Sequence, residues 1–103
     1  MKAARFKIGD IVKHITHGYR AVVIDVDPIF QASGRHNPRA IKESFATKNP
    51  WYRLLVDESN QITYVEEPHL MEDINAQEII NAHLEEHLGI NKSGGYIAKQ
   101  KTH

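Results

Sequence analysis

The residues best suited to chemistry form the run His83-Leu84-Glu85-Glu86-His87 near the C-terminal end of the chain. This is the spacing of the inverted zinc-peptidase motif, in which two histidines one helical turn apart bind zinc and the glutamate acts as a base. A catalytic zinc also needs a third protein ligand. Only 16 residues follow His87, and none of them is Asp or Glu. We therefore expect no metal site, and we expect His83 and His87 to pack against the protein or a partner.

Other catalytic patterns are weak. His14 and His17 are three positions apart, which places them on opposite faces of a regular strand. Asp25 and Asp27 come just before Pro28, where a role in a turn is expected rather than acid–base catalysis. The sequence contains neither a phosphate-binding loop nor a nucleophile elbow. It therefore predicts a protein that is not an enzyme and that uses no cofactor.

Aromatic and basic side chains are interleaved along the segments that are expected to form strands. Exposed rings beside Lys and Arg can bind nucleic acid through stacking and phosphate contacts. The alternative interpretation is that these rings fill the core of a small domain. The residues that make up the candidate DNA-binding set are Lys13, Arg20, Arg35, Arg39, Trp51 and Arg53.

Charge is divided unevenly along this chain of 103 residues, whose formal net charge is zero. Residues 1–53 contain ten Lys/Arg and four Asp/Glu, whereas residues 54–103 contain three Lys/Arg and nine Asp/Glu. The basic half can meet a polyanion, and the acidic half can meet a basic partner or the basic half of the same fold. The absence of cysteine excludes disulfides and thiolate chemistry, and it suits a reducing compartment. No signal peptide and no apolar run of ~20 residues is recognisable, so we expect a cytoplasmic protein with no membrane partner.

Five short segments rich in β-branched and aromatic residues must position these side chains. The spacing of the turn signals predicts a mostly β fold. It is either a small Src-homology-3-like barrel or a strongly bent antiparallel sheet of about five strands, with a short C-terminal α-helix. The expected strands are residues 11–15, 19–26, 51–57 and 62–65, and residues 69–74 are expected to form a tight turn and a short fifth strand or an extended closing segment. The expected core residues are Val22, Val23, Leu55 and Val65.

Two segments depart from this β pattern. Residues 29–50 are long for a loop and are predicted to form an excursion with a helix start at Asn37-Pro38. Residues 75–88 are predicted to form an amphipathic helix. Residues 1–88 would then be a single domain and residues 89–103 a flexible tail. The helix face expected to bind the sheet or a partner contains Ile79, Ile80, His83 and His87.

Several motifs, taken in order, resemble the HspQ family, also called the YccV-like or hemimethylated-DNA-binding domain. The matching residues are Phe6-x-Ile8-Gly9-Asp10-x-Val12-x-His14, Gly18-Tyr19-x-Ala21-Val22-Val23, Asp25-x-Asp27-Pro28, Pro50-Trp51-Tyr52-x-x-Leu55-Val56-Asp57 and Thr63-Tyr64-Val65-x-Glu67-x-x-Leu70. The chain departs from the family in residues 29–50, in its Lys- and Gly-rich tail, and at Ala21, where the family often has Gly. The resemblance implies a compact β-barrel and a bacterial cytosolic heat-shock protein without catalytic residues.

The resemblance also implies two activities, and the residues offer an argument for each. The acidic C-terminal half favours a protein-quality-control factor that binds an ATP-dependent protease or its substrates and promotes their degradation. The basic N-terminal half favours a protein that recognises hemimethylated double-stranded DNA, although a net charge of zero is unusual for nucleic-acid binding. We take the first as the main hypothesis and the second as its alternative. The sequence leaves open whether the protein forms a homo-oligomer.

Overall fold

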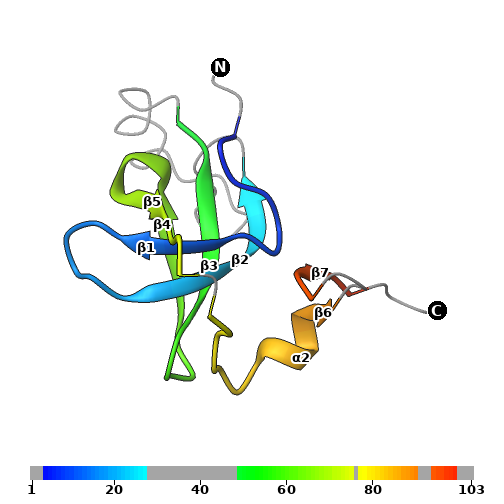
Figure 1. Cartoon of the computed structure of the whole chain (residues 1–103). Coiled ribbons are helices and arrows are strands. Elements are labelled where there is room, and N and C mark those ends of the chain that lie inside the picture. The colour runs from blue at the N-terminus through cyan, green and yellow to red at the C-terminus, as the bar shows by residue number, and fades with distance from the viewer. Residues whose placement is uncertain (1–3, 28–48, 76, 91–93, 100–103) are drawn as a thin grey trace.

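In the computed structural model, which describes residues 4–27, 49–75, 77–90 and 94–99, a five-stranded antiparallel sheet is accompanied by a small two-stranded sheet (Figure 1). The large sheet has the order β4-β3-β2-β1-β5. Its strands are β1 (Ile11–His14), β2 (Arg20–Asp27), β3 (Trp51–Val56), β4 (Ile62–Glu66) and β5 (Leu70–Glu72). The remaining elements are η1, a 3-10 turn (Glu67–His69), the helix α2 (Leu84–His87), β6 (Leu88–Ile90) and β7 (Tyr96–Ala98). Among the described residues, neither helix has the length or apolar character needed to cross a membrane.

The predicted mostly β fold is confirmed, and each of the five expected strand segments contains a strand. β4 and β5 occupy the two edges of the large sheet and do not pair with each other, so the described strands form no closed barrel. An open antiparallel sheet is therefore the correct one of the two expected architectures. β2 carries a bulge where the register shifts between Val23 and Asp25, and a bulge increases the local twist of a strand.

The alternation of side chains along the strands creates two core clusters, one on each face of the sheet. The predicted core residues Val22, Val23, Leu55 and Val65 are all buried, but they are divided between the two faces. The first core cluster consists of Phe6, Val12, Ala21, Val23, Tyr52, Leu54, Val65 and Leu70. The second core cluster consists of Val22, Leu55, Ile79 and Leu88.

The predicted helix over residues 75–88 is wrong for most of its length, because α2 contains only Leu84–His87. Side chains bind two of the backbone N–H groups that the helix would have used. The N–H of Ile80 donates to the carboxylate of Asp57 at 2.7 Å, and the N–H of His83 donates to the side chain of Asn81 at 2.8 Å. These contacts outweigh the weak intrinsic helix preference of the segment.

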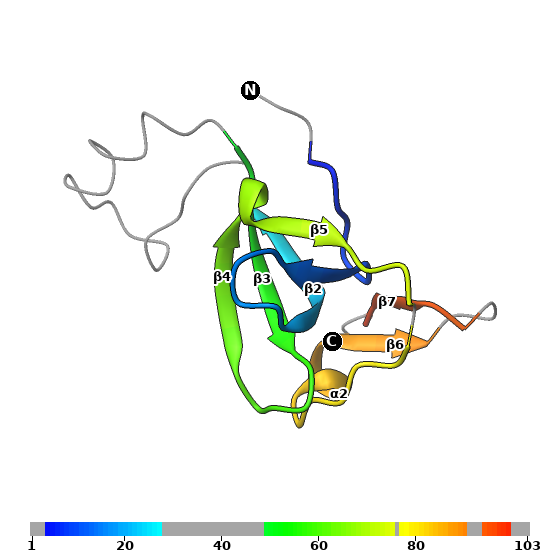
Figure 2. The same ribbon diagram turned by 60° about the vertical axis from the view of Figure 1, so that its left-hand side comes forward.

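Part of the expected flexible tail is folded. Leu88–Ile90 pairs with Tyr96–Ala98 in a β-hairpin, and Leu88 is buried in the second core cluster. Figure 2 shows α2, β6 and β7 together on one side of the large sheet. The helix start expected at Asn37-Pro38 lies outside the described residues, as does most of the excursion over residues 29–50.

Candidate functional site

The described members of the candidate DNA-binding set lie in two separate groups on one face of the sheet. Lys13 and Arg20 are directly opposite each other on β1 and β2. Trp51 and Arg53 lie farther along, on β3. Between the two groups, the second core cluster is covered by the segment that contains Ile79. The structure therefore does not join these residues into one surface, and the other two candidates, Arg35 and Arg39, lie outside the described residues.

Trp51 and Arg53, together with Tyr64 of β4, form an aromatic cluster. The rings of Trp51 and Tyr64 stack with centroids 5.2 Å apart and an interplanar angle of 27°. The guanidinium of Arg53 lies 5.7 Å from the centroid of Tyr64, within the range of a cation–π contact. Both rings are half-buried and Arg53 is exposed. The cluster is thus a partly exposed stacking surface that carries one positive charge.

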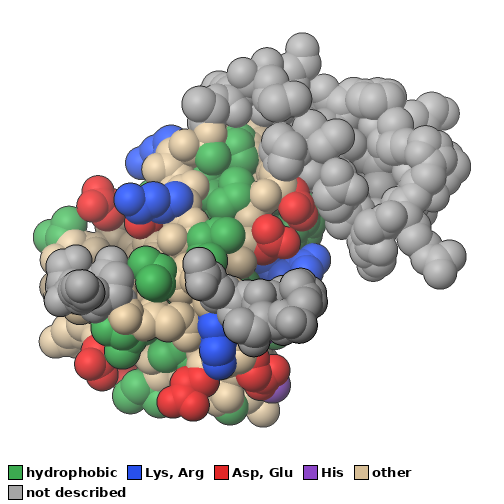
Figure 3. Space-filling view, turned by 90° about the vertical axis from the view of Figure 1, so that its right-hand side faces the viewer, with side chains coloured by type: hydrophobic (Ala, Val, Ile, Leu, Met, Phe, Trp, Pro, Cys, Tyr) green, Lys and Arg blue, Asp and Glu red, His purple; other side chains and the backbone are tan. Residues whose placement is uncertain are grey.

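Two carboxylates flank this aromatic cluster. Asp25 is directly opposite Arg53 across β2 and β3, and Asp27 is directly opposite Trp51. Asp27 also accepts a hydrogen bond of 2.7 Å from the hydroxyl of Tyr64. In the space-filling view of Figure 3, acidic and basic side chains are likewise interspersed rather than segregated by sign. Phosphate attraction at the aromatic cluster is therefore weak. The strand register, which the sequence alone does not reveal, places Tyr64 and the two aspartates beside Trp51 and Arg53.

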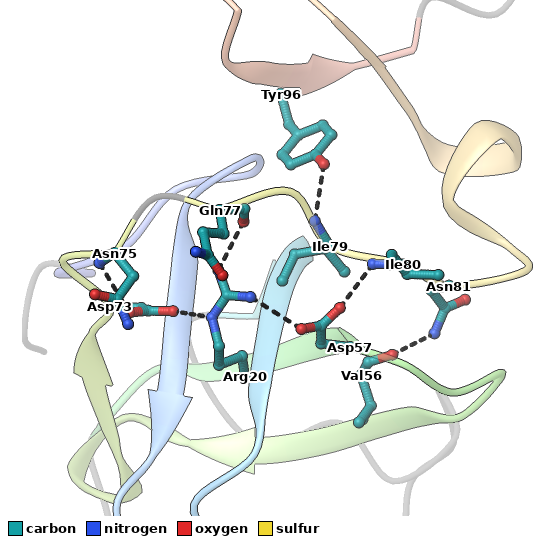
Figure 4. A network of polar contacts seen from close by, with 10 residues as sticks. All are labelled: Arg20, Val56, Asp57, Asp73, Asn75, Gln77, Ile79, Ile80, Asn81 and Tyr96. Atoms are coloured by element: carbon teal, nitrogen blue, oxygen red, sulfur yellow. Dashed lines mark hydrogen bonds and ion pairs between the residues drawn. The ribbon is translucent and has the colours of Figure 1, made fainter.

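Arg20 connects three segments of the fold through its guanidinium, so it is not a free cation. Its guanidinium bonds the carboxylates of Asp57, at 2.9 Å, and Asp73, and it donates to the carbonyl of Gln77 at 2.6 Å (Figure 4). Only 18% of its side chain is exposed. The hydrogen bond from Arg20 lowers the pKa of Asp73, and the same bond raises the pKa of Arg20. A phosphate could reach Arg20 only by displacing these carboxylates, whereas its neighbour Lys13 is exposed.

The four residues expected to form one helix face do not share a face. Ile79 is buried, whereas Ile80 is 67% exposed. His83 is half-buried, and its Nδ1 lies 2.7 Å from Oε2 of Glu86, while His87 is exposed. The helix that would have aligned both histidines with Ile79 does not form, so they do not pack on the sheet as one face with it, and their contact with a partner stays a prediction. Within the described ranges, no three His, Asp or Glu side chains are grouped so that they could hold a metal ion.

A shallow hollow of about 480 Å³ lies between the N-terminal segment and β5, apart from the aromatic cluster. Its lining mixes one arginine with three carboxylates and two apolar side chains. The residues that line it are Arg5, Phe6, Gly9, Asp10, Ile11, Glu72 and Asp73. Because Asp73 is already bound to Arg20 and Asp10 accepts from the N–H of Lys7, two of these carboxylates have partners within the chain.

Comparison with known protein families gives a match over most of the chain. Residues 4–94 match the family model described as "Hemimethylated DNA-binding protein YccV like". The match includes all five strands of the large sheet, α2 and β6, and it extends on both sides beyond the motifs found in residues 6–74.

Proposed function

Because this chain belongs to the YccV-like family, we propose that it binds DNA duplexes that are methylated on one strand. The observation that carries the proposal is the aromatic cluster, where two stacked rings and Arg53 share a partly exposed face. An arginine can bind a base edge or a phosphate, and an aromatic ring can contact a base or a methyl group. The cluster combines both kinds of contact.

The chemistry of a single methyl group limits how large the preference can be. Burying one methyl group against apolar surface contributes about 0.8 kcal/mol, which corresponds to a roughly fourfold change in affinity. Discrimination against a fully methylated duplex needs a different cause, such as exclusion of the second methyl group by a flanking side chain. Asp25 and Asp27 stand at the position to do this, because each is directly opposite a member of the aromatic cluster.

The charge distribution supports weak electrostatic binding. Of the described candidates, Lys13 and Arg53 are exposed, whereas Arg20 is bound to two carboxylates. Each phosphate contact contributes about 0.9 to the slope of log affinity against log salt concentration. Two such contacts predict a slope of about −2, much shallower than that of a strongly basic DNA-binding domain.

The test is to titrate the protein with unmethylated, hemimethylated and fully methylated duplexes of one sequence at two salt concentrations. We expect the hemimethylated duplex to bind most tightly, and we expect Trp51→Leu to remove this preference. Arg53→Gln should weaken binding to all three duplexes and reduce the slope by about 1. Lys99→Gln, which removes the same charge from an exposed site after β7, serves as the control. Equal affinity of the unchanged protein for all three duplexes would overturn the proposal.

We propose as a second candidate that the protein acts as a heat-shock quality-control factor of the HspQ type in the bacterial cytoplasm, where it promotes degradation by an ATP-dependent protease. The segment from Leu54 to Asn91 contains no Lys or Arg, and it exposes Ile74 by 88% and Ile80 by 67%. Exposed apolar side chains on an acidic surface can bind a partner that is basic or that is unfolded and exposes apolar residues.

The second candidate is tested by measuring how fast an ATP-dependent protease degrades a denatured substrate with and without the protein. We expect acceleration that Ile80→Ser reduces and that Ile97→Ser, an exposed isoleucine in β7, leaves unchanged. An unaltered degradation rate in the presence of the protein would remove this candidate.

A further inference from the structure

Three imidazole rings gather at the turn that joins β1 to β2. The ring of His14 has its centroid 4.5 Å from that of His17 and 5.9 Å from that of His69, with which it stacks at an interplanar angle of 10°. The ring of Tyr19 lies 5.1 Å away on another side. His17 belongs to the turn, Tyr19 precedes β2, and His69 belongs to η1. The cluster thus joins two connections that are far apart in the chain.

His14 is the buried centre of this cluster, with 7% of its surface exposed. Its Nδ1 accepts a hydrogen bond of 3.1 Å from the backbone N–H of His17, so this nitrogen carries no proton in the structure. The backbone of His14 also closes the turn. Its N–H donates to the carbonyl of Tyr19 at 2.8 Å, and its carbonyl accepts from the N–H of Gly18 at 2.8 Å.

The described groups that face His14 provide no negative charge to stabilise an imidazolium ion. They are His17 from the turn, Tyr19 just before β2, His69 from η1, and the apolar Leu70 directly opposite on β5. Burial lowers the pKa of His14, and the neighbouring His17 and His69 lower it further. The neutral ring is therefore the form that this site accommodates.

We propose that the β1–β2 turn is a proton-operated switch, closed around neutral His14 and opened when that ring is protonated. A proton on Nδ1 would point at the N–H of His17, so two donors would face each other and the hydrogen bond would be lost. The charged ring would also be buried beside two other imidazoles. Both costs are relieved when the charged ring leaves the site. Its departure also frees the turn from η1, to which the turn is now held by the hydrogen bond from the N–H of Ile15 to the carbonyl of His69.

The direction of the effect follows from proton linkage. The open turn binds a proton with the ordinary histidine pKa of about 6.5, whereas the closed turn binds it only at lower pH. The closed form is thus fully favoured above about pH 6.5 and loses stability as the pH falls toward the lowered pKa of His14. Within that window, a single proton makes the opening equilibrium up to about tenfold more favourable per pH unit.

The experiment is an NMR titration of the full chain between about pH 8 and pH 5. It follows the imidazole signals of all histidines and the hydrogen-exchange protection of the His17 and Gly18 amides, corrected for the intrinsic exchange rate. We expect His14 to titrate below the ordinary histidine pKa of about 6.5, and we expect protection of the two amides to fall in step with it. A titration of His14 at or above the ordinary histidine pKa of about 6.5 would overturn the proposal.

Variants separate the switch from general acid destabilisation. His14→Phe keeps a ring in the cluster but cannot be protonated, so protection of the Gly18 amide should no longer depend on pH. His69→Gln removes one neighbouring imidazole and should reduce the size of the pH effect. His83→Gln, on α2, is the matched control and should leave the effect unchanged. An undiminished pH dependence in His14→Phe contradicts the switch, and the titration of the unchanged protein decides the matter even where this variant fails to fold.

Discussion

The hydroxyl of Tyr52 donates a hydrogen bond of 2.5 Å to Oε1 of Glu67, and both residues are buried. The same carboxylate oxygen accepts from the backbone N–H of Arg5 at 2.8 Å. The N–H of Phe6 in turn donates to the Tyr52 hydroxyl at 3.2 Å. Burial, with a further contribution from Glu67, raises the pKa of Tyr52 to about 12. This pair therefore connects the N-terminal segment, β3 and η1.

Replacing Tyr52 by Phe should destabilise the fold by about 2 kcal/mol, because the buried Glu67 carboxylate and the N–H of Phe6 each lose a partner. Urea unfolding followed by fluorescence measures the change. Tyr64→Phe is the matched control, since its hydroxyl bonds Asp27 at a partly exposed site, and it should cost less than about 1 kcal/mol. Equal losses of unfolding free energy in the two variants would show that burial of the Tyr52–Glu67 pair adds nothing to stability.

Truncation of Val23 to Ala should lower the free energy of unfolding by about 1–3 kcal/mol, through lost burial and a residual cavity. Val23 is fully buried in the first core cluster, on a strand with neighbours on both sides. Val26→Ala removes the same atoms from a half-buried position on the same strand and should cost clearly less. A loss below about 0.5 kcal/mol at Val23 would contradict the central place of β2 in the core.

The strands could be predicted because the information that specifies them is local. β-branched runs such as Ala21-Val22-Val23-Ile24 alternate with Gly, Pro and polar turns, and both signals act over a few residues. The division of the core into two clusters is harder to predict from the sequence. Two consecutive buried residues, Val22 and Val23, point to opposite faces, so the second cluster becomes visible only when Ile79 is known to cover it.

The site could not be predicted to the same extent, because its determinants are distant in sequence. Arg20 resembles a surface cation until its partners are known, and Asp57 and Asp73 lie 37 and 53 residues away. The helix expected over residues 75–88 fails for the same reason, because Asp57 is 23 residues from the Ile80 amide that it binds. Neither contact leaves a periodic pattern in the sequence.

Replacing Arg20 by Met should cost about 2–4 kcal/mol, since it leaves the nearly buried carboxylates of Asp57 and Asp73 without their cation. Hydrogen exchange should show the largest loss of protection at the Ile80 amide. Arg53→Met, at an exposed site, should cost less than about 0.5 kcal/mol and serves as the control. A loss of similar size in both variants would contradict the structural role of Arg20.

The Arg20–Asp73 pair also makes a prediction about acid. Arg20 lowers the pKa of Asp73, so the pair stabilises the fold above the unfolded aspartate pKa of about 3.9 and loses this effect as the pH falls below it. Arg20→Met should therefore flatten the decline of stability between about pH 4 and pH 2. An unchanged acid profile in the variant would show that Asp73 is stabilised by other groups.

Gly9 tests whether the β6–β7 hairpin is held against the large sheet. Its φ of 98° favours glycine, and a Cβ at this position would lie 2.1 Å from the carbonyl oxygen of Tyr96. Gly9→Ala should therefore displace β7, break the bond from the Ile79 N–H to the Tyr96 hydroxyl, and cost more than about 2 kcal/mol. Gly18→Ala is the matched control, because Gly18 also has a positive φ, of 75°, but nothing lies within 4 Å of its Cβ position, so only the backbone cost of about 1 kcal/mol applies. Urea unfolding measures both losses, and hydrogen exchange at the Ile79 amide reports whether the hairpin has moved. If Gly9→Ala costs no more than Gly18→Ala and leaves that amide protected, the hairpin does not dock through Gly9.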